Sequence, residues 1–128
     1  MSASTISDTV VIANEVHMPR IGLGTFRARG EECRTSVVAA LGCGIRHIDT
    51  ASVYKNEADV GWAIAHAMDA FAIQRKDVFI TSKVSPYEQG TNNARAAVEA
   101  SLRALGVRCG TPVSVPAANG RSELYTIA

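Results

Sequence analysis

Three polar side chains of the sequence could combine into a site for proton transfer: Asp49, Tyr54 and Lys83. Asp49 lies at the carboxyl end of the predicted strand 46–50, and Tyr54 follows it in a polar connection. Lys83 ends the predicted strand 78–83. Because the carboxyl ends of parallel strands open on one face of a sheet, we expect these side chains to meet there.

The residue types allow two interpretations of this arrangement. An Asp and a Lys at neighbouring strand ends can neutralise each other, which offsets the hydration that either charge would lose alone. An ammonium group near Tyr54 would also stabilise the phenolate that proton donation leaves behind, so Tyr54 would become a usable proton donor. The alternative is a purely structural ion pair, with Tyr54 as a loop anchor.

The elements that position these residues form a repeating pattern of a short apolar strand and an amphipathic helix. The predicted strands are 21–26, 46–50 and 78–83, and the predicted helices are 31–41, 57–70 and 94–105. Such alternation is typical of parallel strands joined by helical crossovers, either in an open doubly wound sheet or in a closed barrel. A small hairpin within residues 10–16 precedes the repeats.

The end of the chain breaks this rhythm. Pro112 and Pro116, together with Gly110 and Gly120, leave no run long enough for a helix, and only residues 111–115 could be extended. We therefore predict two regions, the β/α repeats within 1–106 and an irregular tail at 107–128.

The composition excludes several classes of protein. A balance of 13 Lys and Arg against 12 Asp and Glu argues against nucleic acid or a membrane surface as the partner. The 47% of hydrophobic residues predicts a folded domain. The cysteines Cys33, Cys43 and Cys109 include no C-x-x-C pair, so we expect neither a metal site nor a disulfide framework. Without a leader or a transmembrane stretch, the sequence predicts a cytoplasmic protein.

The two glycines of the first predicted strand, Gly22 and Gly24, could belong to a dinucleotide-binding fingerprint. That fingerprint needs a third glycine where Arg27 stands, and its helix begins inside the motif. We favour the alternative, a tight strand end at which glycine lets a neighbouring element approach closely.

Longer motifs resemble the aldo-keto reductase family. The segment Gly44-Ile-Arg-His-Ile-Asp-Thr-Ala51, then Tyr54-Lys-Asn-Glu57 and Val60-Gly61, is similar to the family's signature. Met18-Pro-Arg-Ile-Gly-Leu-Gly-Thr25 is similar to its opening strand, and Asp77-Val-Phe-Ile-Thr-Ser-Lys83 to its third. The resemblance covers residues 10–106.

The resemblance implies an α/β fold, the N-terminal portion of a (β/α)₈ TIM barrel, with a hairpin and three β/α units forming an incomplete barrel. It implies NADPH-dependent reduction of an aldehyde or ketone, the small-molecule carbonyl substrate, to an alcohol by hydride transfer. Tyr54 would protonate the carbonyl oxygen and Lys83 would act on Tyr54. Asp49 would hold Lys83 and contact the nicotinamide ribose.

The loop after the first strand would contact the cofactor in this family, through Gly24, Thr25, Phe26 and Arg27. Without the resemblance, Thr25 and Arg27 would suit an exposed loop equally well. Ser85 stands where many members carry a tryptophan that walls the substrate pocket, which bears on substrate preference.

The family's fourth catalytic residue, a histidine at the end of the fourth strand, has no counterpart in the sequence. The family pattern stops at Val107 or Arg108, so we expect a truncated or frame-shifted chain. One hypothesis is therefore a reductase present as an incomplete chain. A second is an inactive fragment that associates with itself or another chain through its open sheet edge. A third is an unrelated flavodoxin-like binding domain.

Overall fold

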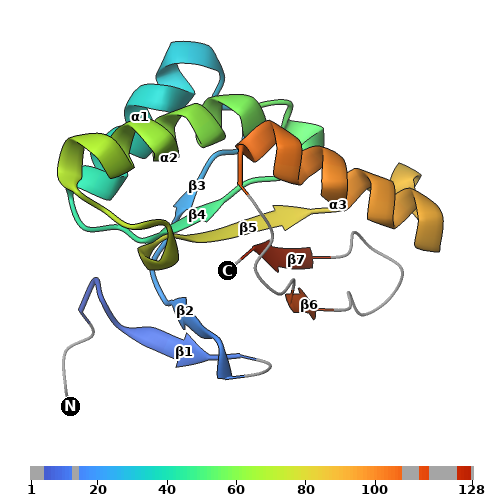
Figure 1. The fold of residues 1–128 in the computed structure, drawn as a ribbon, viewed down its shortest axis with the longest axis horizontal. Coiled ribbons are helices and arrows are strands. Elements are labelled where there is room, and N and C mark those ends of the chain that lie inside the picture. The colour runs from blue at the N-terminus through green and yellow to red at the C-terminus, as the bar shows by residue number, and fades with distance from the viewer. Residues whose placement is uncertain (1–4, 13–14, 108–112, 116–123, 128) are drawn as a thin grey trace.

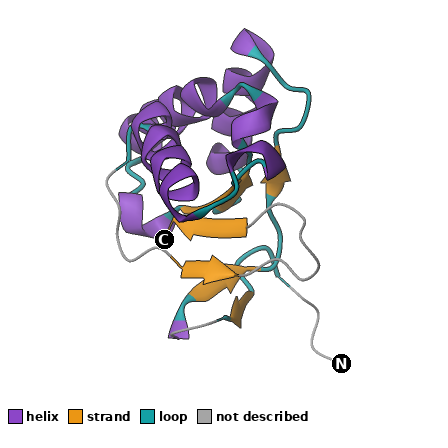
Figure 2. Ribbon diagram, turned by 90° about the vertical axis from the view of Figure 1, so that its right-hand side faces the viewer, coloured by secondary structure: helices purple, strands orange, loops and turns teal. Residues whose placement is uncertain are grey.

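The computed structural model describes residues 5–12, 15–107, 113–115 and 124–127. Within these ranges, three long helices cover one face of a five-stranded sheet (Figure 1). A two-stranded hairpin, β1 (Thr9–Val11) and β2 (His17–Pro19), lies on the other side of the sheet from the helices (Figure 2). None of the helices in the described ranges is long and apolar enough to cross a membrane.

Three β/α units form the body of the fold, which confirms the order predicted from the sequence. These are β3 (Leu23–Gly24) with α1 (Gly30–Gly42), β4 (His47–Asp49) with α2 (Glu57–Phe71), and β5 (Phe79–Lys83) with α3 (Thr91–Leu105). Short 3-10 helices, η2 (Ser52–Tyr54), η3 (Arg75–Asp77) and η4 (Pro86–Glu88), lie in the connections. Strands β3, β4 and β5 are parallel neighbours, so their carboxyl ends share one edge.

Side chains alternate between the two faces of β4 and β5, as they must on a pleated strand. Ile48 and Ile80 are paired in register and are fully buried in the core under the helices. Burying one such side chain contributes about 1.5–3 kcal/mol to folding. The opposite face carries the polar side chains of His47, Asp49 and Thr81, whereas Ser82 lies on the helix side and donates to Glu57 of α2.

Three elements differ by more than one residue from the sequence prediction. The strand predicted at 21–26 is limited to Leu23–Gly24. The hairpin extends further on both sides than residues 10–16, because its strands lie at Thr9–Val11 and His17–Pro19. Helix α3 begins earlier than predicted, at Thr91, directly after Gly90, whose φ of +99° suits glycine. Its first turn is polar, so a search for apolar periodicity does not detect it.

The tail differs more. The sequence predicts an irregular tail at 107–128 in which only residues 111–115 could be extended, and β6 (Val113–Val115) lies within that stretch. The strand β7 (Leu124–Ile127), which pairs antiparallel with both β5 and β6, is not predicted. The physical reason is that a strand forms where an unpaired edge such as that of β5 offers hydrogen-bond partners, whatever the local spacing of proline and glycine. The tail residues 108–112, 116–123 and 128 lie outside the described ranges.

Gly22 confirms the predicted close approach. A Cβ added at this glycine would lie 2.9 Å from the backbone oxygen of His47, which is too close for any side chain. Glycine at this position therefore lets the segment before β3 run directly against β4.

Candidate active site

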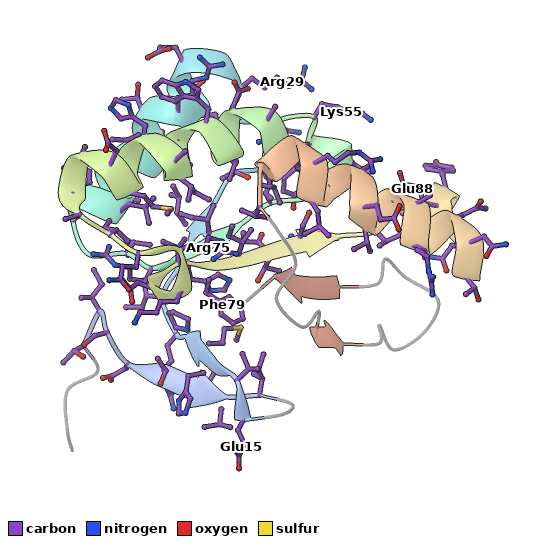
Figure 3. The ribbon with its side chains drawn as sticks, in the orientation of Figure 1. Glu15, Arg29, Lys55, Arg75, Phe79 and Glu88 are labelled. Carbon is purple, nitrogen blue, oxygen red and sulfur yellow. The ribbon has the colours of Figure 1, made fainter. Side chains whose placement is uncertain are left out.

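Asp49, Tyr54 and Lys83 come together at the carboxyl ends of the parallel strands. Asp49 is the last residue of β4, Lys83 is the last residue of β5, and Tyr54 is the last residue of η2. In Figure 3, Phe79 lies at the start of β5, and Glu88 lies in η4, beyond the carboxyl end of that strand.

The Lys83 ammonium is the centre of this group. Its Nζ lies 2.7 and 2.9 Å from the two carboxylate oxygens of Asp49 and 3.0 Å from the backbone oxygen of Thr50. It also lies 3.5 Å from the hydroxyl oxygen of Tyr54. One positive charge therefore contacts both a carboxylate and a phenol.

The charged pair remains open to solvent. The side chain of Lys83 is 24% exposed and that of Asp49 is 36% exposed, so a small molecule can reach both. A phenol beside an ammonium can give its proton to an acceptor on its open side, because the positive charge stabilises the phenolate that remains. The arrangement can therefore support acid catalysis.

The loop after β3 contacts this group directly. Both the backbone N–H and the hydroxyl of Thr25 donate to the backbone oxygen of Asp49, each at 3.0 Å. The ring of Phe26 lies 5.2 Å from that of Tyr54, between centroids, and is 65% exposed. The guanidinium of Arg27 lies 5.1 Å from the Phe26 centroid, and its φ of +65° is uncommon for a residue with a side chain.

This loop and its neighbours fit an anionic dinucleotide. A Cβ added at Gly24 would meet nothing within 4 Å, so there is open space beside the end of β3. Arg27 is exposed and could pair with a phosphate, and the Asp49 carboxylate could accept a hydrogen bond from a sugar hydroxyl. The described residues contain no group of His, Cys, Asp and Glu side chains that could hold a metal ion.

Two residues to which the sequence assigned no role, Glu88 and the Asn56 of the Tyr54-Lys-Asn-Glu57 motif, hold the loops of the site. Asn56 lies between η2 and α2 and bonds to the loop after β3. The Glu88 carboxylate accepts from the backbone N–H of Ser85 at 2.9 Å and from the Ser52 hydroxyl at 3.3 Å. The spacing of Ser85 and Glu88 is a capping-box signal that the sequence contains, but no local signal reveals the contacts of Asn56.

His47 lies on the same sheet face, deeper along β4. Its Nε2 is 2.8 Å from the Thr81 hydroxyl, its Nδ1 is 3.3 Å from the backbone oxygen of Pro19, and its ring meets Phe79 edge-on. The neutral ring satisfies both contacts, with Nδ1–H donating to Pro19 and Nε2 accepting from Thr81. Burial lowers the pKa of His47 below its ordinary value of 6.5.

This shift predicts a loss of stability in acid. Below about pH 6.5 the unfolded chain takes up a proton at His47 that the folded chain resists, so the free energy of unfolding should fall as the pH falls from 7 to 5. Urea denaturation at a series of pH values measures this slope. The slope should become shallower in His47→Gln and persist in His17→Gln, which removes an exposed histidine; an equal slope in all three proteins would contradict the assignment.

Comparison with known proteins gives a consistent picture. The family model described as "Aldo/keto reductase family" matches residues 20–110. The chain is 42% identical over 106 residues to an aldo-keto reductase of Mycobacterium avium and 44% identical over 103 residues to a glyoxal reductase of Bacillus subtilis. These matches cover 83% and 80% of the chain, but the chain spans only 36% of the length of either relative.

Solved structures agree with the fold. An aldo/keto reductase of Brucella melitensis superimposes with a TM-score of 0.75 at 35% identity, over 84% of this chain and 40% of that protein. An aldo-keto reductase of Bombyx mori in complex with NADP superimposes with a TM-score of 0.76 at 29% identity, over 83% of this chain and 36% of that protein. The described sheet is open and corresponds to part of the neighbours' (β/α)₈ barrel, which confirms the incomplete barrel predicted from the sequence.

Proposed function

The chain belongs to the aldo/keto reductase family, and on that premise we propose that it supplies the proton-donating part of a carbonyl reductase site. The observation that carries the proposal is the position of Lys83 Nζ, which contacts the Asp49 carboxylate and the Tyr54 hydroxyl together. The substrate class is an aldehyde or a ketone, and the product is the corresponding alcohol.

The reaction needs one hydride and one proton. NADPH, when bound, supplies the hydride to the carbonyl carbon and is oxidised to NADP⁺. The Tyr54 hydroxyl donates its proton to the carbonyl oxygen, which completes the alcohol, and solvent later returns a proton to the phenolate. Lys83 stabilises that phenolate from 3.5 Å, and Asp49 keeps the ammonium in place through both of its oxygens.

The cofactor would lie along the loop after β3. Gly24 would leave room for it, the exposed Phe26 would border it, and Arg27 would offer a positive charge for a phosphate. The buried Thr25 would support this loop through its two bonds to Asp49. Asp49 would accept from a ribose hydroxyl while it still holds Lys83. The NADP complex of the Bombyx mori relative supports the choice of NADPH.

A second candidate function rests on the sheet edges. Within the described residues, β3 and β6 each pair with a strand on one side only. An unpaired strand edge is a template for association, so the chain could act without turnover by binding another copy or another chain. In that case it would form a stable complex but bind no NADPH.

One experiment separates the two functions. Residues 1–107 would be fused to the remaining part of the Bacillus subtilis glyoxal reductase, and NADPH oxidation would be measured with glyoxal. A reductase site predicts turnover by the fusion protein and quenching of NADPH fluorescence by the 128-residue chain. An inactive fusion protein, together with a chain that leaves NADPH unbound and forms dimers in light scattering, would favour the second function.

A further inference from the structure

Asn56 occupies the N-cap position of α2 but does not cap the helix. The side-chain oxygen of an N-cap asparagine ordinarily accepts a hydrogen bond from a backbone N–H of the first turn. No such bond forms here, although the backbone oxygen of Asn56 accepts from the N–H of Val60 in the usual way. The side chain is therefore used elsewhere.

The whole amide is used in contacts outside α2. Its Nδ2 donates to the backbone oxygen of Thr25 at 2.7 Å and to that of Ala28 at 2.9 Å. Its Oδ1 accepts from the Thr50 hydroxyl at 2.9 Å. Asn56 is only 1% exposed, so water does not compete for the groups that form these bonds.

These bonds join two loops that also meet through the rings of Phe26 and Tyr54. One is the loop after β3, residues 25–28, and the other is the connection from β4 through η2, which carries Tyr54. Only an amide provides two donors and an acceptor in one side chain of this size; Asp, Ser and Thr, the other common N-cap residues, could cap α2 but could not make all three bonds.

From this geometry we propose that Asn56 is a positioning residue, which sets the spacing between the loop that would contact the cofactor and Tyr54. The inference rests on the proposed reductase function. A cap would stabilise α2 alone, whereas the observed bonds hold the backbone oxygens of Thr25 and Ala28 in place relative to the proton donor. Loss of the two donors should release the loop and leave the helix intact.

Amide hydrogen exchange in the 128-residue chain tests the proposal with the variant Asn56→Asp. The variant keeps the shape of the side chain and the acceptor for the Thr50 hydroxyl. It replaces the donating amide nitrogen with a carboxylate oxygen, which would face the backbone oxygens of Thr25 and Ala28. The protected N–H groups of Thr25 and Ala28 should exchange about tenfold faster or more. The amides of α2 around Ile64 should keep their rates, since a general loss of stability would accelerate them equally.

Ser52→Ala is the matched control. It removes the hydrogen bonds of η2 to Glu88 and to the backbone oxygen of Lys83, neither of which involves the loop after β3, and should leave the exchange at Thr25 and Ala28 unchanged. If Asn56→Asp does not fold, Thr50→Val removes only the bond to Oδ1 and should give a smaller acceleration at the same two amides. Unchanged exchange at Thr25 and Ala28 in whichever Asn56 or Thr50 variant folds would overturn the proposal.

NADPH titration of the same proteins separates this inference from the function on which it rests. The dissociation constant should rise about tenfold in Asn56→Asp, because the loop is no longer held in its binding position. An unchanged dissociation constant, despite a released loop, would overturn the positioning role. Failure of the unaltered chain to bind NADPH would instead count against the proposed function, while the exchange rates would still decide whether Asn56 holds the loop.

Discussion

Replacing Tyr54 with phenylalanine should lower the turnover of the fusion protein by about 10²–10⁴-fold, the range that a positioned proton donor contributes. The variant keeps the ring that packs on Phe26 but removes the hydroxyl next to Lys83. The affinity for NADPH should stay nearly the same, because the hydroxyl acts on the carbonyl oxygen. The measurements are kcat for glyoxal and the dissociation constant of NADPH.

Tyr87→Phe is the control for this prediction. Tyr87 is 95% exposed on η4, so the same chemical change beside the site should leave kcat within about twofold, as expected for an exposed residue. Lys83→Met should also lower kcat, because the phenolate loses its positive neighbour. Full turnover in Tyr54→Phe would remove Tyr54 from the mechanism and leave it as a loop anchor.

Substituting Gly61 with alanine should destabilise the 128-residue chain by about 1–3 kcal/mol, the usual cost of overpacking a close contact. Alanine in a helix is otherwise favoured over glycine by about 1 kcal/mol. Gly61 lies in α2 against the end of α3, and a Cβ there would lie 2.6 Å from the backbone carbon of Leu105. Since backbone atoms cannot rotate away, α2 and α3 would have to separate.

Gly42→Ala is the matched control, because Gly42 also lies in a helix. A Cβ at Gly42 would meet only the tip of the Phe71 ring at 2.9 Å, and Phe71 is 47% exposed and free to turn away. Urea denaturation should therefore show a clear decrease in the free energy of unfolding for Gly61→Ala. For Gly42→Ala the free energy of unfolding should change little or increase. Equal behaviour would contradict the close approach of the two helices.

The candidate site could be predicted in part, because its residues stand at the ends of recognisable strands. Alternation of apolar strands and amphipathic helices predicts parallel pairing, and parallel pairing brings Asp49 and Lys83 to one edge. The structure adds the distances, and with them the contact of Lys83 with Tyr54. Whether these residues act in catalysis stays a prediction until the variants are measured.

Other features could not be predicted, since they depend on contacts between distant segments. Asn56 stands where a helix cap is expected, and nothing near it in sequence indicates that its amide bonds to Thr25 and Ala28. Gly61 lies in an ordinary helical pattern, and its need to be glycine comes from Leu105. The pairing of β7 with β5 likewise depends on an edge that the tail itself does not contain.

The sequence by itself determined the order of the three β/α units and the family, because periodicity and local motifs are properties of neighbouring residues. Only the tertiary structure decided which side chains touch. The Lys83 ammonium contacts the Tyr54 phenol, and Asn56 ties one loop to another, because parallel pairing and helix packing bring together residues that lie far apart along the chain.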